Sequence, residues 1–209
     1  MSHAFPVFLD VAEKPCLVIG GGTTAAAKVE ALLEAGARVT VIAPALCSEL
    51  RDRAGLRWEA REYEPGDLQG VFLAIVARED RSMNGRIFAE AEKAQALLNC
   101  LDDPPHCRFI FPALHRQGRL AVAISTDGAC PALAVRLRDR IAAETGPEYA
   151  EFLERMAALR GRIAERWPDF ETRKAVWYRI VDSPALQLLK EGRGEEADAA
   201  VEAILKSLS

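Results

Sequence analysis

Short apolar runs alternate with amphipathic stretches through the first hundred residues of the chain. Four runs have the largely apolar composition of strands that are buried on both faces of a parallel sheet. They comprise residues 16–19, 39–42, 70–77 and 96–101. Apolar positions recur at helical spacing in 23–35 and 84–96, and 46–55 also has a helical pattern. Residues 57–63 alternate as a strand does, and 7–9 are expected to form an edge strand. This alternation predicts an α/β fold with a doubly wound parallel sheet.

The pattern changes after residue 102, where two apolar stretches follow each other without a helix between them. Residues 108–112 and 119–124 have the composition of strands, and Gly118 lies in the turn that joins them. We therefore expect a hairpin outside the parallel sheet. From residue 131 onward the pattern is helical, with interruptions at residues that begin or end helices. These interruptions lie near Gly146-Pro147, Trp167-Pro168, Ser183-Pro184 and Gly192.

The composition is that of a soluble globular protein and argues against several classes of function. The 209 residues carry a net charge of -4, which argues against a nucleic-acid-binding protein. No apolar run approaches the ~20 residues that cross a bilayer, so no membrane association is expected. The N-terminus lacks the basic start and long apolar stretch of a signal peptide, which predicts a cytoplasmic protein.

The cysteines give no sign of a disulfide framework or of a metal site. They are Cys16, Cys47, Cys100, Cys107 and Cys130. Their number is odd and none lies in a CxxC pair, so free thiols are expected. The spacing of Cys100, His106 and Cys107 matches no common structural zinc pattern, and we therefore expect no bound metal.

A glycine-rich turn joins the first buried run to the first helical stretch. Gly20, Gly22 and Ala25 match the pattern G-x-G-x-x-G/A. The first glycine permits a tight turn, the second lets the backbone approach a pyrophosphate, and the third small residue lets the helix pack closely on the strand. The helix N-terminus, at Thr23 and Thr24, offers free N–H groups and a partial positive charge to the phosphates. The pattern predicts a nicotinamide dinucleotide site, and the alternative is a turn of this shape that binds nothing.

The second strand does not end in the acidic residue that commonly binds a ribose in such sites. Ala43-Pro44-Ala45 stand there instead. Either backbone groups of this turn hold the ribose hydroxyls, or the cofactor carries a 2′-phosphate. No arginine follows Pro44 before Arg51, which gives a phosphate little support. NAD is therefore the favoured cofactor.

Four further stretches have a recognisable pattern. They are VTVIAP at 39–44, NCLDDP at 99–104, FIFPA at 109–113 and STDGACPALA at 125–134. Together with GGGTTAAAK at 20–28, their order and spacing resemble the precorrin-2 dehydrogenase/sirohydrochlorin ferrochelatase family of siroheme biosynthesis. That family also ends its second strand in an Ala-Pro-like turn without an acid, which accounts for Ala43-Pro44.

The resemblance implies a Rossmann-type NAD-binding domain at 1–112, a small strand-exchanged dimerisation region at 113–146 and an all-helical domain at 147–209. A homodimer is therefore expected. The resemblance also implies NAD-dependent oxidation of the tetrapyrrole precorrin-2 to sirohydrochlorin. In bifunctional members the same cleft then inserts ferrous iron, which would make Fe²⁺ or Co²⁺ a further substrate. The alternative is a non-catalytic NAD-linked tetrapyrrole carrier or sensor of the same fold.

The family's key carboxylate lies in an Asn-x-x-Asp-x-Pro stretch and maps onto Asp102. Asp102 follows the run 96–101, at the carboxyl end of a strand, where doubly wound folds bind ligands. We expect it to act as a general base, in a cleft where partial burial and the neighbouring Asp103 raise its pKa. The alternative is that Asp102 only shapes the turn before Pro104.

A substrate with many carboxylates requires further polar contacts. The candidates are Asn99, Ser125, Thr126 and Arg136. Ser125 and Thr126 would otherwise cap the helix that follows them, and Arg136 would otherwise belong to a solvated helix face.

Two positions depart from the family pattern. Arg78-Glu79 stand where Thr-Asp is common, and Arg108 stands where Asp or Ser commonly precedes Phe-Ile.

Overall fold

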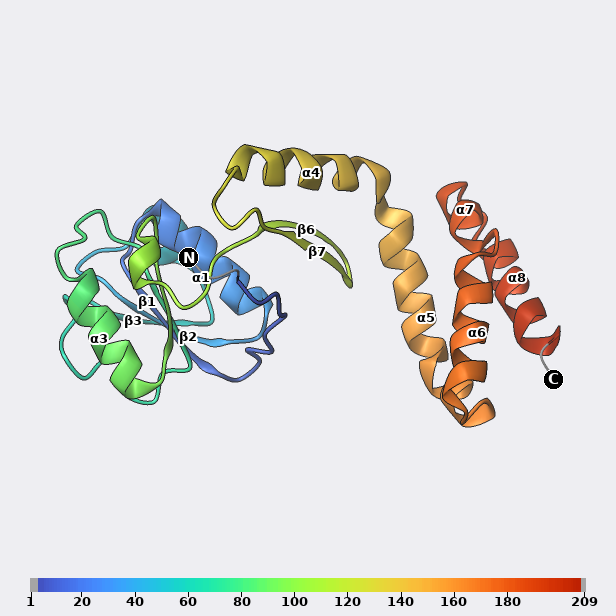
Figure 1. Cartoon of the computed structure of the whole chain (residues 1–209), viewed down its shortest axis with the longest axis horizontal. Helices are drawn as coiled ribbons and strands as arrows, with labels where there is room; N and C mark the ends of the chain where they lie inside the picture. The colour runs from blue at the N-terminus through green and yellow to red at the C-terminus, as the bar shows by residue number, and fades with distance from the viewer. Residues whose placement is uncertain (1–3, 208–209) are drawn as a thin grey trace. The chain divides into compact units, whose positions relative to one another are not determined.

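The computed structural model describes residues 4–207 of the chain, which divides between Ile110 and Phe111 into two compact units. The first unit holds a parallel sheet with its helices, and the second holds a hairpin and the remaining helices (Figure 1). Each unit buries a hydrophobic core of its own. Each unit is therefore a domain with its own core.

Five parallel strands form the sheet of the first unit. They are β1 (Pro15–Ile19), β2 (Arg38–Ile42), β3 (Leu56–Glu59), β4 (Leu73–Val76) and β5 (Leu97–Cys100). Their order is β3-β2-β1-β4-β5, so the direction in which strands are added reverses between β1 and β4. Ile19 at the end of β1 pairs with Ile42 on one side and with Val76 on the other. The predicted doubly wound parallel sheet is confirmed, and folds of this kind bind ligands at such a reversal.

Helices cover both faces of this sheet because alternate strand residues point to opposite sides. The helices are α1 (Thr23–Glu34), α2 (Ser48–Arg51) and α3 (Asn84–Ala94). Val18 of β1 belongs to one core with Val29 of α1, whereas Ile19 belongs to the other with Ile87 of α3. Each of these four side chains is almost fully buried, and each such burial contributes about 1.5–3 kcal/mol. The two cores thus fix β1 and the turn that follows it.

Three segments of the first unit differ from the expectation. Residues 7–9 are exposed irregular chain and not a strand, because an apolar run forms a strand only where a neighbouring strand supplies hydrogen bonds. The helix expected at 46–55 is limited to the four residues of α2. The strand expected at 57–63 is β3, which ends at Glu59, where the chain enters a loop that is held by side chains.

The second unit begins with a hairpin that packs on a helix. Strands β6 (Ala113–Gln117) and β7 (Leu120–Ile124) pair in antiparallel register, and they contact α4 (Pro131–Glu144). Gly118 has a φ of 57° in the turn between the strands, a conformation that glycine adopts without steric cost. The predicted hairpin is therefore present.

The first strand of that hairpin is displaced from the predicted residues 108–112. The N–H of Arg108 donates to a backbone carbonyl of β5 at 2.7 Å, and Nδ2 of Asn99 donates to the carbonyl of Phe109 at 2.7 Å. These bonds hold Arg108 and Phe109 beside β5, within the first unit. Pro112 has no N–H for a ladder, so pairing begins one residue later.

Four helices complete the second unit, and their breaks fall at the predicted prolines and glycines. They are α5 (Pro147–Arg166), α6 (Phe170–Val181), α7 (Ala185–Lys190) and α8 (Gly194–Ser207). The carboxylate of Asp169 caps α6 by accepting a hydrogen bond from the N–H of Thr172 at 2.8 Å. Ile163, Trp167 and Ile180 lie in the shared core. Within the described part of the chain, none of the helices has the length and apolar character needed to span a bilayer.

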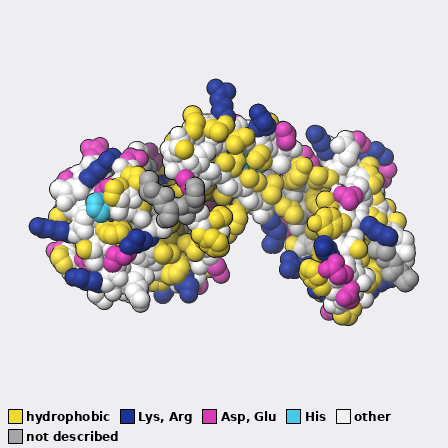
Figure 2. All heavy atoms as spheres, in the orientation of Figure 1, with side chains coloured by type: hydrophobic (Ala, Val, Ile, Leu, Met, Phe, Trp, Pro, Cys, Tyr) yellow, Lys and Arg dark blue, Asp and Glu magenta, His cyan; other side chains and the backbone are white. Residues whose placement is uncertain are grey.

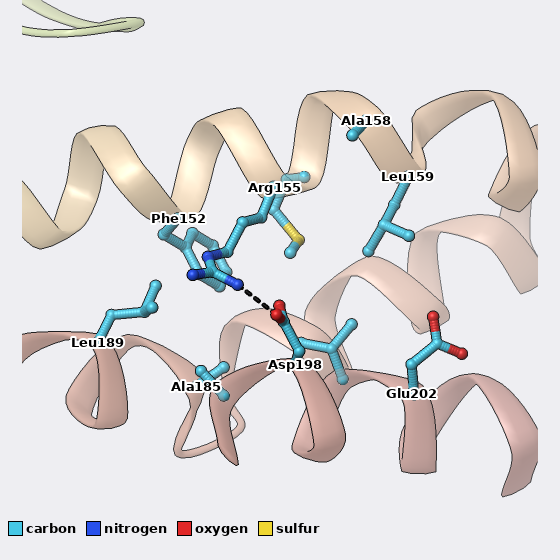
Figure 3. Close-up of a pocket in the computed structure, with 11 residues that line it drawn as sticks. Phe152, Arg155, Ala158, Leu159, Ala185, Leu189, Asp198 and Glu202 are labelled. Carbon is cyan, nitrogen blue, oxygen red and sulfur yellow. Dashed lines mark ion pairs between the residues drawn. The ribbon is translucent and has the colours of Figure 1, made fainter. Parts of the chain in front are cut away.

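Helices α5, α7 and α8 line a cavity of about 280 Å³ (Figure 3). Phe152 and Leu189 are among its mainly apolar walls. Arg155 forms an ion pair with Asp198 in this cavity, and its guanidinium also binds Glu151 at 2.6 Å. The charge of Arg155 is therefore compensated within the second unit.

Candidate functional site

A second cavity, of about 590 Å³, lies at the carboxyl ends of β1, β2 and β4. Its walls come from the glycine turn after β1, the turn after β2 and the loops after β3 and β4. The sheet order reverses at this place, between β1 and β4. The cavity thus has the location and the size of a small-molecule site in a doubly wound fold.

The three glycines after β1 meet different constraints. Gly20 has a φ of 127°, and a Cβ added to it would lie 2.2 Å from the carbonyl oxygen of Ala77. A Cβ on Gly21 would lie 2.1 Å from the carbonyl oxygen of Ala45. A Cβ on Gly22 would meet no atom within 4 Å. The first two glycines are therefore required for packing, while the third leaves open space beside the cavity that it lines.

The N-terminus of α1 presents its first-turn amides at this turn. Gly22 is the N-cap residue, and its carbonyl accepts the first helical bond, from Ala26 at 3.0 Å. The N–H groups of Thr23 and Thr24 precede that bond and have no acceptor within the helix. The first turn contains no acidic side chain. These features together suit an anionic group such as a phosphate.

The turn after β2 divides into a buried and an exposed part. Ala43 is buried, its N–H donates to the carbonyl of Glu59 at 3.2 Å, and its carbonyl accepts a bond from Nε1 of Trp58 at 2.9 Å. Pro44 and Ala45 are exposed at the cavity. Backbone contacts to a ribose stay a prediction for all three residues, and Pro44 and Ala45 have the accessible positions.

Four charged residues line the cavity in addition to the residues expected from the sequence. They are Glu62, Arg78, Glu79 and Asp80. Nη1 of Arg78 lies 2.9 Å from Oε2 of Glu62, and the arginine side chain is only 23% exposed. The sequence signalled this feature only through the unusual Arg78-Glu79 pair, and it gave no indication of the partner.

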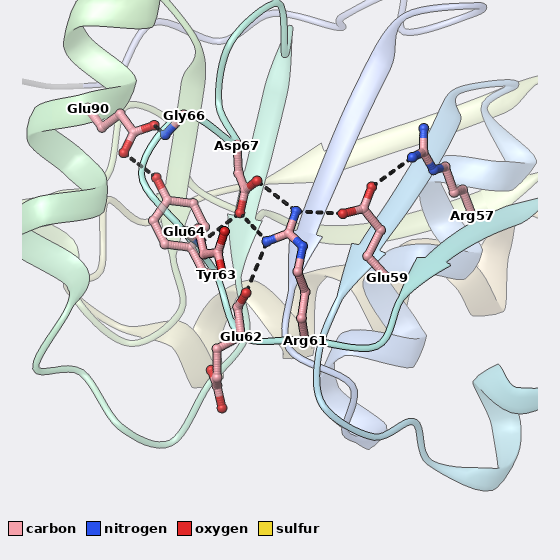
Figure 4. A network of polar contacts seen from close by, with 9 residues as sticks. All are labelled: Arg57, Glu59, Arg61, Glu62, Tyr63, Glu64, Gly66, Asp67 and Glu90. Atoms are coloured by element: carbon pink, nitrogen blue, oxygen red, sulfur yellow. Dashed lines mark hydrogen bonds and ion pairs between the residues drawn. The ribbon is translucent and has the colours of Figure 1, made fainter.

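A polar network fixes the loop that carries Glu62 (Figure 4). The guanidinium of Arg61 makes two 2.8 Å bonds to the carboxylate of Asp67, a bond to Glu59 and a 3.0 Å bond to the carbonyl of Glu62. Arg61 holds the pKa of the Asp67 carboxyl below its usual range. The loop therefore leaves β3 in a defined conformation.

The same loop is anchored to α3 on the other side of Glu62. The hydroxyl of Tyr63 donates to Oε2 of Glu90 at 2.5 Å, and the N–H of Gly66 donates to Oε1 of the same carboxylate at 2.7 Å. Burial, and then the Glu90 carboxylate, raise the pKa of Tyr63. Its hydroxyl thus stays a donor at physiological pH.

The turn after β5 separates its two aspartates. Asp102 has a φ of 57°, and its side chain is 88% exposed, with one carboxylate oxygen 3.8 Å from Nη2 of Arg81. The expected partial burial of Asp102 is therefore wrong, because the turn shields the neighbouring side chain of Asp103, which is 16% exposed, in its place. Its role as general base stays a prediction.

Asp103 takes the protected position that was expected for its neighbour. Its Oδ2 accepts a bond from Nδ2 of the buried Asn84 at 2.8 Å and lies 2.8 Å from Nδ1 of His106. Asn84, followed by His106, holds the pKa of the Asp103 carboxyl below its usual range. Asp103 thereby ties the turn to the start of α3.

The four predicted substrate contacts fall into two groups. Asn99 is 5% exposed within β5, and its Nδ2 is engaged by Phe109. Ser125, Thr126 and Arg136 belong to the second unit, where Thr126 Oγ1 accepts a bond from the N–H of Cys130 at 3.2 Å, just before α4. Ser125 and Arg136 are exposed. Substrate contact stays a prediction for these residues, and the bond of Thr126 lies within the loop, because the N-cap residue of α4 is Cys130 and no side chain caps this helix.

Three family models match the chain in succession. Residues 7–113 match a family described as putative NAD(P)-binding, 117–144 match the sirohaem biosynthesis protein central family, and 148–205 match the sirohaem synthase dimerisation region. The first match covers the whole sheet and the cavity at its carboxyl ends. A nicotinamide-cofactor-binding domain is therefore established for the first unit.

Relatives and a solved structure agree with these matches. Siroheme synthase of Sodalis glossinidius (strain morsitans) is 37% identical over 97% of this chain, and that of Methylococcus capsulatus (strain ATCC 33009 / NCIMB 11132 / Bath) is 38% identical over 92%. The chain spans 44% and 41% of those two proteins, less than half of each. The solved structure of SirC, precorrin-2 dehydrogenase, is similar over 98% of both chains, with a TM-score of 0.75 and 25% identity. The chain thus belongs to the putative NAD(P)-binding family that matches residues 7–113, and its remaining segments match two sirohaem families, in agreement with the resemblance of its motifs.

Proposed function

We propose that this protein oxidises precorrin-2 to sirohydrochlorin and uses NAD as the hydride acceptor. The observation that carries the proposal is the cavity of about 590 Å³, which combines an open glycine turn, a free helix N-terminus and a sheet reversal. The similarity to a precorrin-2 dehydrogenase along the full chain supports the choice of substrate. When bound, NAD would accept a hydride while the substrate also loses a proton.

The charges around the cavity favour NAD over NADP. Among the described residues that line it, Arg78 is the only cation, and Glu62, Glu79 and Asp80 are acids. A 2′-phosphate would add about two negative charges to this acidic surface. A ribose with free hydroxyl groups adds none and can donate hydrogen bonds to carboxylates.

Asp102 is the proposed general base for the departing proton. One residue separates it from the end of β5, and it lies at the same carboxyl edge of the sheet as the cavity. The bonds of Asp103 to Asn84 and His106 hold the turn, and the Asp102 carboxylate, whose nearest cation is Arg81 at 3.8 Å, stays exposed to a substrate. Asn99 is proposed to contact the substrate. Its side chain also holds the backbone at Phe109 through a hydrogen bond.

The active protein is proposed to be a homodimer. Leu114, Leu133 and Val135 are exposed apolar side chains of β6 and α4, and Figure 2 shows hydrophobic side chains gathered over this part of the second unit. The match to a dimerisation region extends over 148–205. We therefore place the interface on the predicted region 113–146 together with the helices that follow it. A second subunit would cover the edges of the two-stranded sheet.

The similarity to siroheme synthases favours a second activity, insertion of Fe²⁺ or Co²⁺ into sirohydrochlorin. The metal would be a substrate, and Asp102 would serve both steps. Anaerobic incubation with precorrin-2 and NAD, followed by absorbance, tests the oxidation, and subsequent addition of Fe²⁺ tests the insertion. Formation of NADH and sirohydrochlorin is expected. Tight binding of both ligands without turnover would instead identify a tetrapyrrole carrier or sensor.

A further inference from the structure

We propose that the ion pair between Glu62 and Arg78 makes the cavity selective for NAD over NADP. This inference rests on the proposed function, because it concerns the cofactor of that same site. The two side chains meet at 2.9 Å and both line the cavity of about 590 Å³. A specificity-determining role follows from where the pair lies, how it is held and which charge it compensates.

The pair lies across the carboxyl edge of the sheet. Glu62 follows β3 and Arg78 follows β4, two strands that β2 and β1 separate in the sheet. The adenine ribose of a dinucleotide lies at the carboxyl end of the second strand in folds of this kind. That end is the turn at Pro44 and Ala45, which lines the same cavity. A ribose bound at this turn would therefore place its 2′ position in the cavity that the pair lines.

The position of Arg78 is set by the glycine turn. The N–H of the preceding residue, Ala77, donates to the carbonyl of Ile19 at 2.8 Å. The carbonyl of Ala77 lies so close to Gly20 that no Cβ fits between them. Arg78 is thus the first residue of this loop that is free of the packing contact with the turn, and its side chain enters the cavity.

The position of Glu62 is set by anchors on both of its neighbours (Figure 4). Arg61 bonds to Asp67 and also to the carbonyl of Glu62, while Tyr63 is buried and bonded to Glu90. The carboxylate of Glu62 belongs to none of these anchoring bonds and is directed to Arg78 instead. The network thus presents one carboxylate to one guanidinium.

An unpaired arginine at this place would be a phosphate ligand, because a guanidinium forms paired, charge-assisted bonds with phosphate oxygens. Glu62 forms an ion pair with the guanidinium of Arg78, and its negative charge adds to those of Glu79 and Asp80. A 2′-phosphate must therefore displace a carboxylate and enter an acidic surface. Selectivity arises here from a repulsive element as well as from the lack of a free cation.

The experiment measures the dissociation constants of NAD and of NADP by calorimetry, with the full chain. In Glu62→Gln we expect NADP to bind about tenfold more tightly relative to NAD than in the unchanged protein. Glu79→Gln is the matched control, because it removes the same charge from the same cavity without releasing Arg78. The double variant Glu62→Gln with Arg78→Gln should lose the gain. Glu62 and Glu79 are exposed, so the two single variants are expected to fold, and circular dichroism checks the fold of all three variants.

An unchanged NADP-to-NAD ratio in Glu62→Gln would overturn the inference, and so would an equal gain in Glu79→Gln or in the double variant. If the unchanged protein still binds NAD, these results would overturn only the role of the ion pair and would leave the proposed function intact. If the unchanged protein binds neither nucleotide, the proposed function itself is overturned, and the inference with it.

Discussion

The side-chain amide of Asn84, at the start of α3, donates a hydrogen bond of 2.8 Å to the carboxylate of Asp103 in the turn after β5. Asn84 is buried, so this bond is shielded from water. It joins a helix to the turn that presents Asp102. The geometry of the proposed base therefore depends on a residue that does not face the cavity.

Replacing Asn84 by alanine should weaken both the fold and the turn. The free energy of unfolding is expected to fall by about 1–3 kcal/mol, because the Asp103 carboxylate, which is only 16% exposed, loses a donor. The rate of sirohydrochlorin formation should also fall, while the dissociation constant of NAD stays the same. Urea unfolding and steady-state kinetics measure these effects. A variant of normal stability would show that the bond contributes nothing to the turn.

Asp102→Ala should lower sirohydrochlorin formation about 100-fold or more, which is typical for the loss of a positioned acid or base. Because the side chain is 88% exposed, folding and NAD binding should be unaffected. Asp182→Ala, which removes an exposed carboxylate from the second unit, is the control. Near-normal oxidation by Asp102→Ala would assign the proton transfer to another group.

The glycine turn allows binding to be separated from folding. Gly22→Val should fold, because a Cβ there meets no atom within 4 Å, yet it should lose NAD binding because the side chain fills the approach of the pyrophosphate. Gly21→Ala should instead lower the melting temperature, because its Cβ would lie 2.1 Å from a carbonyl oxygen. Thermal unfolding and calorimetry distinguish the two effects. Normal NAD affinity in Gly22→Val would exclude this turn as the phosphate site.

The bond between Arg61 and Asp67 should make stability depend on acid pH. Arg61 lowers the pKa of Asp67 in the folded protein below its unfolded value of about 3.9. The contribution is therefore complete above that unfolded value and is lost as the pH falls through the lower folded value. In Asp67→Asn, the free energy of unfolding measured with urea should fall less steeply as the pH is lowered from about 5 to about 2. Asp52→Asn is the control, and an equal change in both variants would contradict the assignment.

Leu114→Asp should shift the protein from dimer to monomer, because a charge on the exposed face of β6 would be buried unpaired in the proposed interface. Leu9→Asp is a matched control, since both leucines are 44% exposed and Leu9 belongs to the first unit. Light scattering over a range of concentrations reports the change. A monomer in the unchanged protein at every concentration would rule out the dimer.

Local signals were sufficient for the centre of the fold. The run before Gly20, the turn itself and the amphipathic helix after it are contiguous in sequence, and their pattern determines β1, α1 and β2. The apolar run 7–9 failed as a strand prediction because a strand also depends on a neighbour that the run itself does not specify. The shift from 108–112 to β6 has a similar cause, because contacts to β5 decide where pairing begins.

The candidate site was predictable only in its backbone part. Gly20, Gly22 and the turn at Pro44 follow from a motif, but Glu62 and Arg78 meet from loops after two different strands. Such a pair depends on the order of strands in the sheet, which a single sequence does not reveal. The exposure of Asp102 was missed for another reason, since a contact between Asp103 and Asn84, 19 residues apart, decides which of the two aspartates is shielded.

The bond from the indole of Trp58 to the carbonyl of Ala43 gives the chain a fluorescent reporter at its cavity. The sequence holds three tryptophans, and the other two, Trp167 and Trp177, lie in the helical unit. The indole of Trp58 bonds to the turn that faces the cofactor space, so we expect its emission to change when a ligand enters that space. The two units of this protein therefore carry separate optical signals, one for ligand and one for helix packing.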